Sequence, residues 1–124
     1  MTPELDTFTR AFIETLLWSE VDIDADGNMG DAFDAWATAD DIDPEGLAQI
    51  IVDCASFQEA NWDDIADDPE QAGHDFCLTR NRHGAGFWDG DWPRDVGRRL
   101  TEAAHAYGTL GLYCGDDEKL YIHG

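Results

Sequence analysis

Residues 72–92 read Ala-Gly-His-Asp-Phe-Cys-Leu-Thr-Arg-Asn-Arg-His-Gly-Ala-Gly-Phe-Trp-Asp-Gly-Asp-Trp, and the expected fold is built around them. Asp75 to Thr79 is a short apolar and β-branched run, residues 81–84 hold turn formers, and residues 85–88 are a second apolar run. Two such runs around turn residues are typical of a β-hairpin. We therefore expect two paired strands here, with these structural residues: His74, Asp75, Arg80, Asn81, His83, Gly84, Gly86 and Trp88.

The charge of the chain is divided at the turn of this expected hairpin. Residues 1–79 hold 21 Asp and Glu against one base, Arg10, whereas residues 80–124 hold 7 acids against 6 bases. Nearly all of the formal charge of -21 therefore precedes the turn. Because phosphate binding relies on clusters of Lys and Arg, this composition argues against direct binding to nucleic acid or an anionic membrane. The expected partner is a basic protein, and the sequence leaves the oligomeric state open.

A length of 124 residues predicts a single domain over 1–124. We divide it into an acidic helical half, 1–71, and a near-neutral hairpin-helix-hairpin half, 72–124. The hydrophobic fraction of 43% is ordinary for a globular protein, so the chain should fold despite its charge. The sequence has neither a membrane-length apolar run nor the layout of a signal peptide, which favours the cytoplasm. Cys54, Cys77 and Cys114 lie in apolar stretches and are expected to be reduced thiols.

Helical spacing of apolar residues predicts helices on both sides of the expected hairpin. The motif Thr2-Pro3-Glu4 is a helix start, and apolar residues recur at helical spacing as far as Trp18. Residues 20–43 are acidic and irregular, with one short helical turn near Trp36. A second start at Asp43-Pro44-Glu45 opens a helix of roughly five turns that should pack against the first.

The remaining elements complete an α+β arrangement. Trp92-Pro93 opens a third helix, which Gly108 should end in a left-handed conformation. Residues 110–114 and 119–122 then form a last hairpin around 115–118. The expected order is α-α-β-β-α-β-β, with the helices packed on one face of a small antiparallel sheet.

The central stretch also resembles a known family. The matching pieces are Ala-Gly-His-Asp-Phe at 72–76, Leu-Thr-Arg-Asn at 78–81 and His-Gly-Ala-Gly-Phe-Trp-Asp at 83–89, with a looser tail at 100–104, 112–113 and 115–117. They resemble a family of small, acidic, uncharacterised bacteriophage and prophage proteins. The resemblance implies a viral origin, and hence the host cytoplasm, but it implies no activity.

Two positions depart from the pattern of that family. Cys77 stands where tryptophan is usual, and Arg82 stands where glycine is usual. Because a residue with a Cβ resists positive φ, Arg82 argues against a turn that needs positive φ at that position.

Metal-ligating patterns are present but incomplete. Residues 22–27, Asp-Ile-Asp-Ala-Asp-Gly, copy the first half of a calcium loop, but Phe33 occupies the position that needs a bidentate Glu. We favour a solvated acidic loop over a calcium site. A zinc site from His74, Cys77, Cys114 and His123 would require the fold to bring them together. The sequence thus assigns no metal and no cofactor.

The residues His74, Asp75, Arg80, Asn81 and His83 could in principle perform acid–base chemistry. No phosphate-cradling loop, nucleophile elbow or metalloprotease motif completes a mechanism. We therefore favour a structural role for them, in which their side chains fix the turn. No catalytic residue is assigned.

The acidic half is the more informative feature. Duplex DNA carries about one charge per 1.7 Å, so about 20 charges match roughly 34 Å of duplex, close to the width of about 35 Å expected for a compact chain of this length. The charge could therefore mimic nucleic acid, although solubility alone could also explain it. The candidate partner-binding acids are Asp22, Asp24, Asp26, Asp31, Asp34, Asp40, Asp41, Asp53, Glu59, Asp63, Asp64, Asp67, Asp68 and Glu70.

We accordingly expect a phage-encoded acidic inhibitor that blocks a host nucleic-acid-binding defence protein, as anti-CRISPR and anti-restriction proteins do. One alternative is a small hydrolase or metal-binding protein centred on His74, Asp75 and His83. Another is an acidic phage accessory or structural protein without inhibitory activity, for which a homo-oligomer assembled through Trp18, Trp36 or Trp92 would be the sign.

Overall fold

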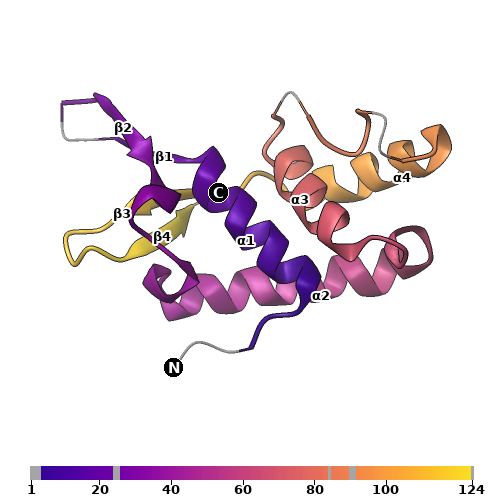
Figure 1. Cartoon of the computed structure of the whole chain (residues 1–124), viewed down its shortest axis with the longest axis horizontal. Coiled ribbons are helices and arrows are strands. Elements are labelled where there is room, and N and C mark those ends of the chain that lie inside the picture. The colour runs from indigo at the N-terminus through magenta and orange to yellow at the C-terminus, as the bar shows by residue number, and fades with distance from the viewer. Residues whose placement is uncertain (1–3, 24–25, 84, 90–91, 124) are drawn as a thin grey trace.

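The computed structural model describes residues 4–23, 26–83, 85–89 and 92–123. Figure 1 shows the elements in chain order. They are α1 (Thr7–Ser19), β1 (Val21–Ile23), β2 (Met29–Ala32), the 3-10 turns η1 (Phe33–Ala35) and η2 (Ala39–Asp41), α2 (Pro44–Ile65), α3 (Pro69–Arg80), α4 (Arg94–His105), β3 (Gly111–Cys114) and β4 (Leu120–His123). The α+β class is confirmed, but the order is α-β-β-α-α-α-β-β instead of the expected one.

The hairpin expected at residues 75–88 is wrong, because residues 69–80 form helix α3. The Asp68 side chain caps this helix by accepting a hydrogen bond from the Gln71 backbone N–H, and Pro69 occupies its first turn. Nearly every residue from Ala72 to Arg80 is buried, which hides the helical period in the sequence.

The residues assigned to that hairpin therefore have other positions. His74, Asp75 and Arg80 belong to α3, and Asn81 is its C-cap. His83, Gly86 and Trp88 follow in irregular backbone, and Gly84 lies outside the described residues.

The predicted helices around residues 44–65 and 94–105 are confirmed. Asp43 caps α2 through the Gly46 N–H, and Gly108 after α4 has φ +77°, as its expected role requires. The start expected for the first helix is wrong: Asp6 caps α1 through the Thr9 N–H, so the helix begins at Thr7. Thr2 and Pro3 lie outside the described residues.

A hairpin of β1 and β2 replaces much of the irregular connection expected at 20–43. Val21 pairs with Ala32 and Ile23 with Met29, while Gly27 has φ +83° between the strands. The last hairpin, β3 with β4, is confirmed. Within the described residues the strands form two separate antiparallel pairs instead of one sheet, and both lie at the end of the molecule opposite α3 and α4 (Figure 1).

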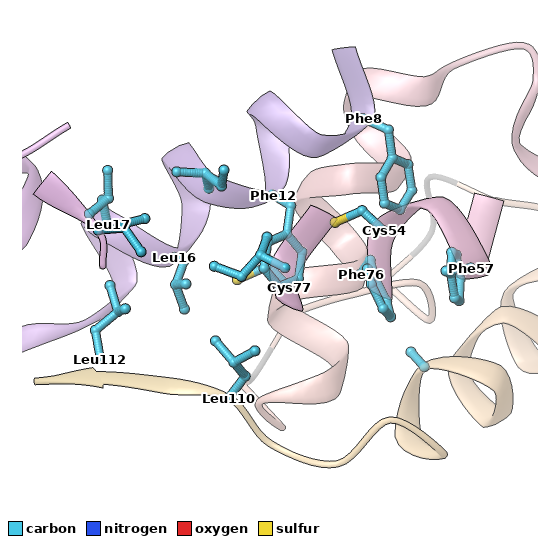
Figure 2. Close-up of a cluster of buried hydrophobic side chains, with 14 of the residues drawn as sticks. Phe8, Phe12, Leu16, Leu17, Cys54, Phe57, Phe76, Cys77, Leu110 and Leu112 are labelled. Carbon is cyan, nitrogen blue, oxygen red and sulfur yellow. The ribbon is translucent and has the colours of Figure 1, made fainter. Parts of the chain in front are cut away.

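The core lies where α1 packs against α3, and α2 contacts both helices. Phe57 and Phe76 stack with ring centroids 4.2 Å apart, and Phe8 and Phe12 contact Phe76 at 5.7 and 5.4 Å. Figure 2 shows these side chains with the buried Cys54 and Cys77. Burial raises the pKa of both thiols. The core includes residues from both charge halves, so the acidic segments are anchored to the near-neutral ones.

Arg82 adopts the conformation that its identity argued against. Its φ is +57°, in the left-handed region, immediately after the end of α3. A glycine at this position would adopt this conformation without strain. The expectation that Arg82 excludes a positive-φ turn is therefore wrong.

We predict that Arg82→Gly raises the free energy of unfolding by about 0.5–1 kcal/mol. The left-handed conformation destabilises a residue with a Cβ by roughly 1–2 kcal/mol, and glycine avoids this strain. The greater freedom of glycine in the unfolded chain reduces the gain by roughly 0.4–1 kcal/mol. Urea unfolding measures the change. Arg82→Ala is the control, because it removes the charge but keeps the Cβ; an equal gain in the alanine variant would contradict the strain explanation.

Candidate functional site

The side chains of His74, Asp75 and His83 have different surroundings. His74 Nδ1 lies 2.9 Å from Thr15 Oγ1, and its ring stacks on Trp18 with centroids 5.8 Å apart. Asp75 is 1% exposed and accepts hydrogen bonds from Trp92 Nε1 at 2.7 Å and from Gln71 Nε2 at 3.1 Å. His83 Nε2 is buried without a hydrogen-bond partner among the described residues. No hydrogen bond joins the three side chains in that part of the chain, so we assign no reaction to them.

Asp75 is a buried carboxyl whose pKa burial raises above its ordinary value of 3.8, although the hydrogen bonds from Trp92 and Gln71 act in the opposite direction. The folded protein therefore holds this proton more tightly than the unfolded chain does. The resulting stabilisation is complete below the ordinary pKa of the carboxyl, and it is lost as the pH rises through the raised value.

We predict that Asp75→Asn changes how stability depends on pH. As the pH rises from about 3 to about 7, the free energy of unfolding of the parent protein should fall relative to that of the variant, because asparagine does not ionise. Urea unfolding of both proteins across this range gives the difference, in which the contributions of the other carboxyls cancel. Parallel curves would show that Asp75 has an ordinary pKa in the folded protein.

Arg80 is a charged side chain that is only 3% exposed. Its Nε donates to the Gly108 carbonyl at 2.9 Å, and its Nη1 donates to Asp53 Oδ2 at 3.1 Å. The guanidinium also lies over the rings of Phe76 and Tyr107, at 5.4 and 5.5 Å from their centroids. The carboxylate of Asp53 is thus used inside the molecule, and we leave Asp53 out of the partner surface expected from the sequence.

Acidic side chains gather where α2 meets α3. One hollow of about 450 Å³ is lined by Asp63, Asp64, Asp67, Asp68, Gln71, Trp92, Pro93 and Val96. A second, also of about 450 Å³, is lined by Ala11, Glu14, Thr15, Trp18, Asp68, Glu70, Gln71 and His74. Because Asp68 and Gln71 line both, the hollows adjoin. We call the two together the acidic groove.

The carboxylates of the acidic groove differ in how far they are used within the molecule. Asp64 pairs with Arg99 at 2.9 Å, and Asp68 caps α3. The side chains of Asp63, Asp67 and Glu70 are exposed and form no hydrogen bond or ion pair with the described residues. These three carboxylates are available to a partner.

The other candidate acids lie away from the acidic groove. Asp26, Asp31, Asp34, Asp40 and Glu59 are exposed on other segments, and Asp41 closes a capping box at η2. Asp24 and the side chain of Asp22 lie outside the described residues, so the calcium-like pattern at 22–27 is described only in part. In the part of the chain that is described, no three His, Cys, Asp or Glu side chains gather as metal ligands, and this applies also to His74, Cys77, Cys114 and His123.

Several residues of the acidic groove, among them Glu14, Trp18 and Gln71, were not predicted from the sequence as part of a binding surface with these acids. Glu14 and Trp18 come from α1, and Gln71 comes from α3, where its Nε2 donates a hydrogen bond to the carboxyl of Asp75. A signal for Glu14 and Trp18 was available in the helical spacing of α1, since they lie four residues apart on its exposed side.

No family model, curated protein or solved structure matches this chain. The resemblance to phage proteins therefore stays a prediction. None of the helices in the described ranges combines the length and the apolar character needed to cross a bilayer.

Proposed function

We propose that this protein is a phage-encoded acidic inhibitor that mimics nucleic acid and blocks a basic, nucleic-acid-binding host defence protein, such as a CRISPR effector or a restriction enzyme. The observation that carries the proposal is the acidic groove. Its free carboxylates, Asp63, Asp67 and Glu70, would pair with Lys and Arg side chains that otherwise bind phosphates. The viral origin rests on the family resemblance alone.

The aromatic rings that line the two hollows of the acidic groove support this choice of partner. Trp92 lies beside the aspartates of the first hollow, and Trp18 lies beside Glu14 and Glu70 in the second. A cation held between carboxylates and a tryptophan face gains from both, and Arg favours such sites. Arginine side chains of this kind line the basic grooves of proteins that bind nucleic acid.

The charge of the whole chain would add speed and salt dependence to the association. A formal charge of -21 attracts a basic partner over a distance that salt shortens, to about 8 Å at physiological ionic strength. We therefore expect association that is fast at low salt and weakens steeply as salt is added.

The test is an interaction screen at low and high salt against a panel of CRISPR effectors and restriction enzymes, with displacement of labelled duplex DNA as the readout. For any partner found, we predict that Asp63→Asn with Asp67→Asn weakens binding at least about tenfold, that is by about 1.4 kcal/mol. Each substitution removes one free carboxylate and keeps the size of the side chain.

The matched control is Asp116→Asn with Glu118→Gln in the turn of the last hairpin, which removes the same charge from exposed positions outside the acidic groove. Equal weakening by both pairs would mean that net charge acts without a defined surface. If the panel contains no partner, or if the first pair binds as the parent does, the proposal fails.

A further inference from the structure

A second groove shares the lining residue Trp92 with the acidic groove. It has a volume of about 560 Å³ and is lined by Phe87, Trp88, Trp92, Arg94, Arg98, Thr101 and Glu102. We call it the arginine groove. Because Trp92 lines both, the two grooves adjoin at this residue.

The two arginines of this groove are unusual in so acidic a chain. Arg94 and Arg98 are both exposed, and neither forms an ion pair or side-chain hydrogen bond with any residue in the described ranges. By contrast, Arg99 on the same helix pairs with both Asp64 and Asp95. Arg94 and Arg98 are one turn apart on α4, so their guanidinium groups can hold a single anionic group between them.

The floor of the arginine groove is aromatic and partly fixed. Phe87 is buried and meets the Trp92 ring edge to face, with centroids 5.8 Å apart. The hydrogen bond from Trp92 Nε1 to Asp75 fixes the indole ring. Trp88, in contrast, is 47% exposed, which leaves an aromatic surface available for stacking. Planar rings of ligands stack on such surfaces.

The third feature is an acceptor at the far end. Glu102 lies eight residues after Arg94 on α4, which places their Cα atoms about 12 Å apart along the helix axis. An anion at Arg94 and Arg98 and a hydroxyl or amino donor at Glu102 would thus span the groove. Sites for small molecules combine an apolar lining with a few polar groups in this way, at volumes of about 300–1,000 Å³.

We propose that the arginine groove binds a small molecule that joins an anionic group to a planar ring, the chemistry of a nucleoside monophosphate. The anion lies between Arg94 and Arg98, the ring stacks on Trp88, and Glu102 accepts hydrogen bonds from the hydroxyl or amino groups. This site adjoins the acidic groove at Trp92 but does not depend on the function proposed for that groove.

The experiment is calorimetric titration of the full chain at physiological salt with four probes: adenosine 5′-monophosphate, adenosine, ribose 5-phosphate and inorganic phosphate. Adenosine 5′-monophosphate should bind with a Kd below about 1 mM, and at least about tenfold more tightly than each of the other three. Equal binding of inorganic phosphate or ribose 5-phosphate would overturn the role of the ring. Equal binding of adenosine would overturn the role of the arginines.

Variants separate this site from unspecific attraction. Arg94→Gln with Arg98→Gln should weaken the binding of adenosine 5′-monophosphate at least about tenfold, and Trp88→Ala should weaken it too. The control pair Arg10→Gln with Arg82→Gln removes the same charge elsewhere and should leave Kd unchanged. Asp63→Asn with Asp67→Asn should also leave it unchanged, so failure here is distinguishable from failure of the inhibitor proposal. Absence of binding, or equal losses in both arginine pairs, would overturn the inference.

Discussion

Replacing Arg80 by methionine should lower the free energy of unfolding by about 3–5 kcal/mol, a range typical of broken buried ion pairs. The change leaves the Asp53 carboxylate without its charged partner, and it removes donors from the carbonyls of Gly108 and Tyr107. Methionine keeps the unbranched stem of the side chain but lacks the guanidinium, so the loss combines the missing polar contacts with the space that the guanidinium leaves. Urea unfolding followed by far-ultraviolet circular dichroism measures it.

The double variant Arg80→Met with Asp53→Asn is the control for this prediction. Neutralising Asp53 removes the unpaired charge and should restore part of the stability, while the two carbonyls stay without donors. A loss below about 1 kcal/mol in the single variant would mean that the ion pair is no stronger than one on the surface.

Gly73→Ala should have an effect of similar size, about 3 kcal/mol, at the upper end of the usual cost of overpacking. A Cβ at Gly73 would collide with the backbone carbonyl oxygen of Phe8 and would lie 2.9 Å from its carbonyl carbon and 3.1 Å from Ala11 Cβ. Because these are mainly backbone atoms of α1, α1 and α3 would have to separate. Their contact is the most extensive between any two elements described, so the core around Phe76 would loosen.

Gly46→Ala is the matched control, because Gly46 is also buried in a helix. The nearest atom to its Cβ would be a side-chain carbon of Ile122, at 3.3 Å, which can move. Alanine also favours the helix by about 1 kcal/mol over glycine, so we expect a change within about 1 kcal/mol. If Gly73→Ala unfolds at the same urea concentration as the parent, the close approach of α1 and α3 is not required.

The comparison of α2 with α3 shows what the sequence could predict. Asp43-Pro44-Glu45 and Asp68-Pro69-Glu70 are the same helix start, and both open helices. The first was recognised because α2 has one apolar face. The second was missed because α3 is buried on nearly all sides, so its apolar run resembled a strand. The Asp26-Gly27 pair is likewise a signal for a hairpin turn. The three aspartates at positions 22, 24 and 26 suggested a calcium loop instead.

The same limit applies to the acidic groove. Charge counting placed the acids in the first half of the chain, and Asp63, Asp64, Asp67, Asp68 and Glu70 do gather at one junction. Charge counting could not show that Asp53 forms an ion pair with Arg80, which lies 27 residues away, because that pairing depends on how α2 and α3 pack. Nor could it bring Glu14 and Trp18 of α1 to the same surface.

The buried thiols of Cys54 and Cys77 make the opening of this protein chemically visible. The thiolate is the reactive form, and burial both shields these sulfurs and raises their pKa, so alkylating reagents should reach them only when the core separates. Their labelling rate in native buffer then reports how often α1, α2 and α3 part, without any denaturant. Residues of the same three helices line the acidic groove. A partner bound there should therefore slow that labelling.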